Sequence, residues 1–200
     1  MNLVSITCYL TIKAIGDYVF SFLSLIILSP LLILLSIFIF ITGGSPVIFS
    51  QKRTGKDGRI FMIYKFRSLM HGKNEGIDLI ADKHDSRITR VGRIMRKYKL
   101  DEIPNLINVL KGDMSLVGPR PEQQFYIEKI VLKAPGYRRL MKVKPGVTSW
   151  GEVKYGYAST VEQMIERLEY DLYYLENRSL QFDLKIILHT VGIVFRGRGI

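Results

Sequence analysis

The sequence is poor in the residues that build disulfides and zinc sites. Its 200 residues include one cysteine, Cys8, and three histidines, His71, His84 and His189. A single cysteine forms no disulfide within the chain, and the scattered histidines match no HExxH or other zinc-ligand motif. Neither a GxGxxG dinucleotide motif nor a GxxxxGK(S/T) phosphate loop occurs. These absences argue against a disulfide-stabilised secreted domain, a zinc enzyme and the common nucleotide-binding folds, and they fit a reducing compartment.

Acidic side chains are also scarce, because 18 Asp and Glu face 29 Lys and Arg. The net charge of +11 and the pI near 9.7 disfavour an acidic tail and predict an anionic partner. Seven prolines and 17 glycines are too few for a low-complexity chain, so we expect one packed unit. The charge is uneven: residues 1–50 carry only Lys13 and Asp17, whereas residues 51–100 carry 14 basic and 5 acidic side chains.

Residues 19–41 form a run of 23 residues without any charge. As a helix this run would be about 34 Å long, enough to cross a hydrocarbon core of about 30 Å. It is longer than the apolar stretch of a cleaved signal peptide, roughly 7–15 residues, and it lacks a clear cleavage site. We therefore expect a membrane segment. The basic residues that follow, from Lys52 to Arg59, predict that the next part of the chain is cytoplasmic.

Pro30 lies in the middle of this run, where it removes one N–H donor and frees the carbonyl of Ile26. The hydroxyls of Ser24 and Ser29 could satisfy the freed backbone groups. A helix kinked at this position could cross the membrane or turn back as a re-entrant hairpin. The physics of the residues alone favours the crossing.

The rest of the chain combines short strands with amphipathic helices, which predicts a mostly helical α+β fold. Residues 47–66 are typical of a β-hairpin, and residues 70–89 of a polar loop. Helical periodicity predicts four helices, over residues 91–98, 102–111, 159–175 and 184–195. We expect the first to be basic and the last to lie at a membrane interface. A capping box of Ser159 with Glu162 is expected to open the third.

Asp101 and Glu102 form an adjacent carboxylate pair at the expected start of the helix over residues 102–111. The helix dipole and neighbouring cations such as Arg96 and Lys99 favour the ionised form of both side chains. The pair could then supply a nucleophile and a metal ligand or base. The alternative is that Asp101 only caps the helix, because aspartate is a common N-cap.

Arg120 lies between Pro119 and Pro121, which restrict the backbone and reduce the entropy lost when the guanidinium binds an anion. A phosphate is the natural ligand, and a proline-rich turn with a solvated arginine is the alternative. Lys65 and Arg67 offer two further cations at the end of a strand. A basic strand edge would explain them equally well.

Three further carboxylates could complete an oxygen-rich magnesium shell, namely Asp113, Asp171 and Asp183. Mg²⁺ is usually held by few carboxylates together with substrate phosphate. Sequence spacing does not show that these side chains meet. We take Asp171, together with Glu102, as the expected metal ligands.

Several motifs point to one family. The most specific is LDEIPNLINVLKGDMSLVGPRP at residues 100–121. Others are Ser29–Pro30, PVIFSQxRxGxxG at residues 46–58, YKFRS at residues 64–68, TRVG at residues 89–92, KPGVT at residues 144–148 and Asp171-x-x-Tyr174. Over nearly its whole length the chain resembles the bacterial sugar transferases, the monotopic polyprenyl-phosphate phosphoglycosyl transferases that begin surface-glycan assembly.

The resemblance implies a magnesium-dependent transfer of a sugar phosphate from a UDP-sugar to a polyprenyl phosphate, with UMP as the leaving group. Asp101 would be the nucleophile and Glu102 the metal-associated carboxylate. Arg96 would be the motif arginine near this pair, and Arg120 would bind phosphate or uridine in the Pro-Arg-Pro loop. The family also implies a re-entrant helix broken at Ser29–Pro30, which we adopt in place of the kinked span.

The chain departs from the family pattern in two places. Ala14 stands where many relatives have an arginine after Lys13, which weakens one interfacial anchor. Ser-Trp-Gly-Glu at residues 149–152 replaces the commoner Gly-Trp-Ala-Gln and puts a carboxylate where an amide is usual. Many relatives also carry an additional N-terminal multi-span region, so we expect this chain to be the minimal catalytic unit.

We therefore expect a re-entrant membrane helix over residues 1–45 and a cytoplasmic catalytic domain with interfacial helices over residues 46–200, at a bacterial inner membrane. The expected partners are a UDP-sugar, polyprenyl phosphate and anionic lipid, with no nucleic acid; a homodimer is left open. Two alternatives remain. One is a membrane-attached, magnesium-dependent nucleotide-sugar pyrophosphatase. The other is a basic protein that binds anionic lipid or RNA through residues 51–99.

Overall fold

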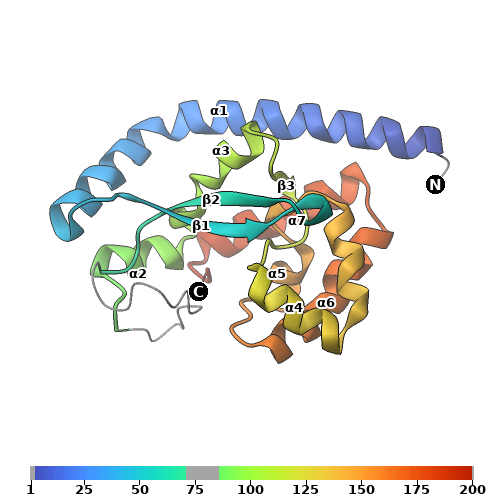
Figure 1. Ribbon diagram of the computed structural model, residues 1–200. Helices are drawn as coiled ribbons and strands as arrows, with labels where there is room; N and C mark the ends of the chain where they lie inside the picture. Colours follow the sequence, from blue (N-terminus) through green and yellow to red (C-terminus); the bar gives the residue numbers. More distant parts are fainter. Residues whose placement is uncertain (1–2, 71–85, 200) are drawn as a thin grey trace.

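The computed structural model describes residues 3–70 and 86–199, with a long N-terminal helix lying over a mostly helical body that contains two small sheets (Figure 1). The α-helices are α1 (Leu3–Gly43), α2 (Arg90–Lys97), α3 (Asn105–Leu110), α4 (Gln124–Lys133), α5 (Trp150–Lys154), α6 (Val161–Glu176) and α7 (Leu180–Phe195). The strands are β1 (Ile48–Thr54), β2 (Ile60–Phe66), β3 (Ser115–Val117) and β4 (Gly146–Thr148). Three 3₁₀ helices are η1 (Lys56–Gly58), η2 (Leu100–Glu102) and η3 (Pro135–Lys142). The mostly helical α+β class is thus confirmed.

Helix α1 is 41 residues long and continues through Pro30. Ser29 Oγ donates a 2.8 Å hydrogen bond to the carbonyl of Ile26, the group that Pro30 cannot pair, so the predicted role of Ser29 is confirmed. The described helix has no break at Ser29–Pro30 and instead curves in its C-terminal part (Figure 1). Its stretch Ile6–Gly43 is long and apolar enough to cross a membrane.

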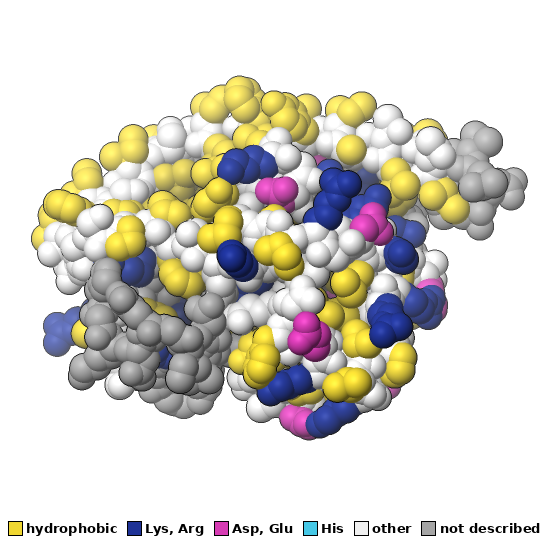
Figure 2. Space-filling model, in the orientation of Figure 1, with side chains coloured by type: hydrophobic (Ala, Val, Ile, Leu, Met, Phe, Trp, Pro, Cys, Tyr) yellow, Lys and Arg dark blue, Asp and Glu magenta, His cyan; other side chains and the backbone are white. Residues whose placement is uncertain are grey.

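Apolar side chains cover the outer surface of α1. Ile27 and Ile41 are each 73% exposed, and hydrophobic side chains follow α1 along the top of the view in Figure 2. A soluble monomer rarely exposes a continuous apolar band of this extent. The helix therefore indicates membrane association.

Polar contacts fix the N-terminal half of α1 to the body. Tyr9 OH and Lys13 Nζ each donate a 2.9 Å hydrogen bond to Asp183 Oδ2 on α7. Ser115 Oγ of β3 donates a 2.5 Å hydrogen bond to Asp17. Asp183, one of the candidate magnesium ligands, is thus occupied in anchoring α1.

Two small sheets lie in the body. The hairpin predicted over residues 47–66 is confirmed, because β1 and β2 pair antiparallel over their full length. A second sheet was not predicted: β3 and β4 are parallel, with Ser115 opposite Gly146. This second sheet positions the loop that carries Arg120, because the loop follows β3 directly.

Three apolar clusters stabilise the structure by removing hydrophobic surface from water, and the third packs α1, β2 and α2 together through Ile39, Phe66 and Met95. The first joins β2, α3, β3, α5, α6 and α7 through Ile63, Leu106, Val109, Met114, Leu116, Val117, Trp150, Tyr174 and Ile186. The second joins α4, η3 and α6 through Ile127, Ile130, Tyr137, Leu140, Ala158, Met164 and Leu168. The elements on which the candidate site depends are therefore held from both sides.

The helix predicted over residues 102–111 is shorter than expected. Residues Leu100–Glu102 form η2, and the α-helix begins only at Asn105. Pro104 has no N–H to donate to the carbonyl of Leu100, which separates η2 from α3. Asp101 lies inside η2, so the interpretation of Asp101 as the cap of this helix is wrong.

The helices predicted over residues 91–98, 159–175 and 184–195 are confirmed as α2, α6 and α7, although their ends differ by up to four residues. The capping box of α6 pairs Thr160 with Gln163, one residue later than the predicted pair of Ser159 and Glu162. Thr160 Oγ1 accepts from the Gln163 N–H, and the Gln163 side chain accepts from the Thr160 N–H. Most of the loop predicted at residues 70–89 lies outside the described residues.

Candidate active site

Asp101 and Glu102, called here the carboxylate pair, lie in η2 where it packs against α2 and β2. Each residue is only 8% exposed. Two adjacent carboxylates buried this deeply need nearby cations, because burying one unpaired charge costs roughly several kcal/mol. The cations come from β2, from α2 and from the loop after β3.

Glu102 is held by two of these cations. Lys65 Nζ donates a 2.5 Å hydrogen bond to Glu102 Oε1, and Arg120 Nη2 donates to the same oxygen at 3.2 Å. Burial alone would raise the pKa of Glu102, but Lys65, Arg120 and Lys99 outweigh it and hold the pKa well below its usual value. Glu102 is therefore ionised at neutral pH, as predicted.

Asp101 has a different environment. Burial raises its pKa, and the negative charge of Glu102 adds to the rise, while Lys65 and Arg96 act in the opposite direction. The prediction that the surroundings favour the ionised form thus fits Glu102 but not Asp101 in the protein alone. Among the described residues no basic side chain forms an ion pair with Asp101, whereas Lys65 and Arg120 both pair with Glu102.

Arg96 reaches the site from α2. Its Nε donates a 2.9 Å hydrogen bond to Ser68 Oγ, just after β2. This contact requires α2 to lie directly against the chain at Ser68, and Gly92 permits it, because a Cβ atom at position 92 would lie 2.2 Å from Ser68 O. The charge of Arg96 thus lies close enough to act on Asp101.

Arg120 joins two carboxylates. Its Nη2 donates to Glu102 and its Nη1 to Glu152, and its side chain is 15% exposed, so the alternative of a solvated arginine is wrong. Close packing fixes the loop, because a Cβ atom at Gly118 would lie 2.5 Å from Lys144 O. The guanidinium is therefore held in place before any substrate binds.

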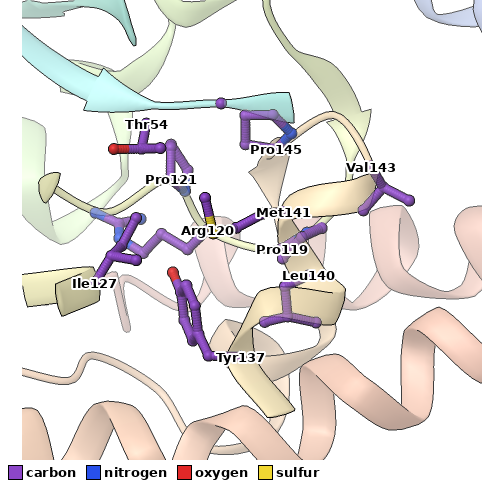
Figure 3. Close-up of a pocket in the computed structure, with 11 residues that line it drawn as sticks. Thr54, Pro119, Arg120, Pro121, Ile127, Tyr137, Leu140, Met141, Val143 and Pro145 are labelled. Carbon is purple, nitrogen blue, oxygen red and sulfur yellow. The ribbon is translucent and has the colours of Figure 1, made fainter. Parts of the chain in front are cut away.

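A small pocket lies beside the Pro-Arg-Pro loop (Figure 3). It is lined by Thr54, Gly55, Pro119, Arg120, Pro121, Ile127, Tyr137, Leu140, Met141, Val143 and Pro145. The hydroxyl of Tyr137 points toward Arg120 in Figure 3. Arg120 thus connects a mostly apolar pocket on one side with the carboxylate pair on the other.

Sequence reasoning named Lys99 only as a cation near the carboxylate pair and Glu152 only as a departure from the family pattern, and it did not place either residue in the site. Lys99 has a left-handed backbone conformation (φ 52°), and its Nζ lies 3.4 Å from Glu152 Oε1. One signal was available: Ser149 is a helix-capping residue type, and its Oγ accepts a 2.9 Å hydrogen bond from the Glu152 N–H. That cap places Glu152 in the first turn of α5.

Arg67 and Asp171 lie elsewhere. Arg67 donates to the carbonyl of Gly43 at the end of α1. Asp171 Oδ2 lies 3.8 Å from Arg167 Nε, and neither Arg67 nor Asp171 makes a described contact with the carboxylate pair.

Across residues 3–70 and 86–199 no group of three or more acidic, histidine or cysteine side chains could hold a metal. A magnesium ion at the pair would therefore need oxygens from substrate and water.

Comparison with known proteins identifies the family. Residues 8–197 match the model of the family described as "Bacterial sugar transferase", and the chain belongs to this family. It is 38% identical, over 191 residues, to a UDP-N-acetylgalactosamine-undecaprenyl-phosphate N-acetylgalactosaminephosphotransferase of Aeromonas hydrophila. It is 39% and 40% identical, over 182 residues each, to UDP-glucose:undecaprenyl-phosphate glucose-1-phosphate transferases of Escherichia coli K12 and Caulobacter vibrioides.

The match covers most of this chain, but it covers less than half of two of the three relatives. It takes in 96% of the chain and 45% of the Aeromonas protein. For the Escherichia coli and Caulobacter proteins it takes in 90% of the chain and 39% and 68% of the relative, respectively. The chain thus spans less than half the length of the first two relatives. The sugars in the names of these relatives also differ, so family membership leaves the sugar open.

Proposed function

We propose that the chain transfers a sugar phosphate from a UDP-sugar to a polyprenyl phosphate such as undecaprenyl phosphate and releases UMP, as the first membrane step of surface-glycan biosynthesis. The names of the relatives support these substrates. The buried carboxylate pair carries the proposal for the chemistry: Lys65 and Arg120 pair with Glu102, no basic side chain among the described residues pairs with Asp101, and the pKa values of the two acids are shifted in opposite directions. Such a separation of two neighbouring acids is typical of catalytic sites.

Asp101 would be the nucleophile in a two-step transfer. In the first step an Asp101 carboxylate oxygen bonds to the sugar-bearing phosphorus, and the bond from that phosphorus to the UMP oxygen breaks. In the second step an oxygen of the polyprenyl phosphate attacks the same phosphorus and frees Asp101. Asp101 suits this role because, within the described residues, no ion pair holds its carboxylate, whereas Glu102 is held by Lys65 and Arg120.

The basic side chains would bind the diphosphate of the donor. Arg120 is fixed by its loop and offers the planar N–H groups that pair well with phosphate oxygens. Arg96 and Lys65 lie near Asp101, where they offset the negative charge that the diphosphate brings to the pair. Their role is to let two anions approach each other.

The carboxylate pair also fits the magnesium ion that the family implies. Mg²⁺ prefers one or two carboxylates together with substrate phosphates, and Glu102 is ionised and adjacent to the proposed nucleophile. Glu102, with Asp101 beside it, would hold the ion. When bound, Mg²⁺ neutralises charge on the diphosphate and on the leaving UMP. We do not place Asp171 at this ion, because its close contacts are with Arg167 and the Gly151 N–H.

The membrane arrangement is a further part of the proposal. Helix α1 would enter the bilayer from the cytoplasmic face of the inner membrane and, through the curve in its C-terminal part, return to the same face. The basic block over residues 51–99 would then lie next to anionic lipid headgroups. Exposed Leu184 and Leu188 on α7 support its place at the interface. A homodimer stays a prediction.

One assay tests the function. The purified chain, in detergent or nanodiscs with Mg²⁺, is given a panel of UDP-sugars with and without undecaprenyl phosphate, and UMP and lipid-linked sugar are measured. We expect one or few donors to give UMP and a matching amount of lipid-linked sugar. Asp101→Asn serves as the matched inactive variant. Steady release of free sugar phosphate without lipid would identify a pyrophosphatase, and no UMP from any donor would contradict a transferase.

A further inference from the structure

Glu152 belongs to the ion network around Arg120. It is the third residue of α5, and its side chain is only 7% exposed. The 2.9 Å bond from its N–H to Ser149 Oγ fixes the first turn of this helix. Glu152 Oε1 accepts a hydrogen bond from Arg120 Nη1 and lies 3.4 Å from Lys99 Nζ. A rigid element thus presents a buried carboxylate to two cations of the site.

The charges alternate along one line of contacts, which runs through Lys65, Glu102, Arg120, Glu152 and Lys99. Arg120 stands in the middle and shares its guanidinium between two carboxylates. Burial alone would raise the pKa of Glu152, but Arg120 and Lys99 outweigh it and keep the pKa below its usual value. Glu152 is therefore an anion that already occupies part of the cationic site.

We propose that Glu152 is a positioning residue that holds Arg120 in the empty site and yields Arg120 Nη1 to the donor's diphosphate, so that its charge sets how tightly the nucleotide binds. This inference deepens the proposed function and rests on it, because it takes the diphosphate to bind at Arg120.

The geometry explains why one carboxylate has to be displaced. A guanidinium binds a phosphate best through two parallel N–H groups. Both Nη atoms of Arg120 donate to carboxylates in the described structure. Glu152 is the partner that can be displaced, because it keeps Lys99 and takes no part in the proposed chemistry, whereas Glu102 belongs to the carboxylate pair.

The test removes the charge and keeps the shape. UDP binding to the purified full chain is measured by calorimetry for the wild type and for Glu152→Gln. We expect the variant to bind UDP with about a tenfold lower Kd, because a neutral amide holds Arg120 Nη1 less strongly than the carboxylate does and yields it to the diphosphate more readily. Uridine, which carries no phosphate, should bind equally to both. In turnover, the KM for the UDP-sugar should fall and kcat should not rise. Mere damage to the fold does not tighten binding.

Two controls show that the effect acts through Arg120. Glu162→Gln removes a charge from an exposed ion pair with Lys133 and should leave UDP binding unchanged. In an Arg120→Ala background, Glu152→Gln should lose its tightening effect, because the shared guanidinium is gone. Should Glu152→Gln fail to fold, Glu152→Asp withdraws the carboxylate from Arg120 by one methylene group. It should also tighten UDP binding, by a smaller factor.

Unchanged or weaker UDP binding in Glu152→Gln would overturn the inference, and so would equal tightening in the Arg120→Ala background. These results are separate from a failure of the proposed function. A wild-type chain that binds UDP but makes no UMP from any donor would refute the transferase, while UDP affinity would still decide the role of Glu152.

Discussion

Replacing Arg120 by alanine removes the side chain that joins Glu102 to Glu152. The fold should survive, because Glu102 keeps Lys65 and Glu152 keeps Lys99 as a partner. Truncating one partner of a buried, hydrogen-bonded charge pair costs about 2–5 kcal/mol. If that loss falls on the bound diphosphate, kcat/KM drops at least about 30-fold.

The assay is UMP release from the preferred UDP-sugar, with thermal unfolding followed by circular dichroism to check the fold. Arg120→Lys should be intermediate, because a lysine ammonium is a point charge without the planar pair of N–H groups. Arg139→Ala is the matched control, since it removes an arginine from an exposed ion pair with Glu176 and should change the rate less than twofold. Wild-type kinetics in Arg120→Ala would remove Arg120 from the site.

Three further predictions concern the surroundings of the site. Gly92→Ala should lower both the melting temperature and the activity. The alanine Cβ would lie 2.2 Å from Ser68 O and would push α2, which carries Arg96, away from the site. An unchanged melting curve would contradict this close packing. Asp183→Asn should loosen the N-terminal half of α1, seen as faster amide hydrogen exchange there, because it weakens two contacts to that helix; equal exchange would refute the anchor. In a Cys8→Ser background, single cysteines at the N-terminus and at Arg198 should both resist an impermeant maleimide in intact cells, and Pro30→Ala should increase N-terminal labelling by straightening α1. Periplasmic labelling of the N-terminal cysteine in the parent would establish a span instead.

The elements that could be predicted from the sequence are those with a strong local pattern. The hairpin has two apolar runs separated by a glycine turn, and α6 repeats apolar residues every three or four positions. The parallel pair of β3 and β4 has no such signal, because each strand has three residues and the strands lie far apart in sequence. Helix α3 begins at Asn105 and not at the predicted residue 102, because Pro104 separates η2 from the helix.

The site was predictable only in part for a similar reason. Asp101, Glu102 and Arg120 lie in one continuous motif, so the sequence indicated them together. Which cation pairs with which carboxylate depends on tertiary contacts, and this is why the sequence did not place Lys99 and Glu152 in the site or show that Arg67 donates to the carbonyl of Gly43. Burial also decides the pKa of Asp101, whose sequence neighbours suggested the opposite direction.

A covalent bond between Asp101 and the sugar phosphate distinguishes the proposed two-step transfer from direct attack by the lipid. Intact-protein mass spectrometry of the chain, incubated with Mg²⁺ and its UDP-sugar but without polyprenyl phosphate, measures this bond directly. The wild type should gain the mass of one sugar phosphate, Glu102→Gln should gain it slowly, and Asp101→Asn should gain none. EDTA should suppress the adduct. Normal turnover by Asp101→Asn, or an adduct that maps to another residue, would contradict Asp101 as the nucleophile.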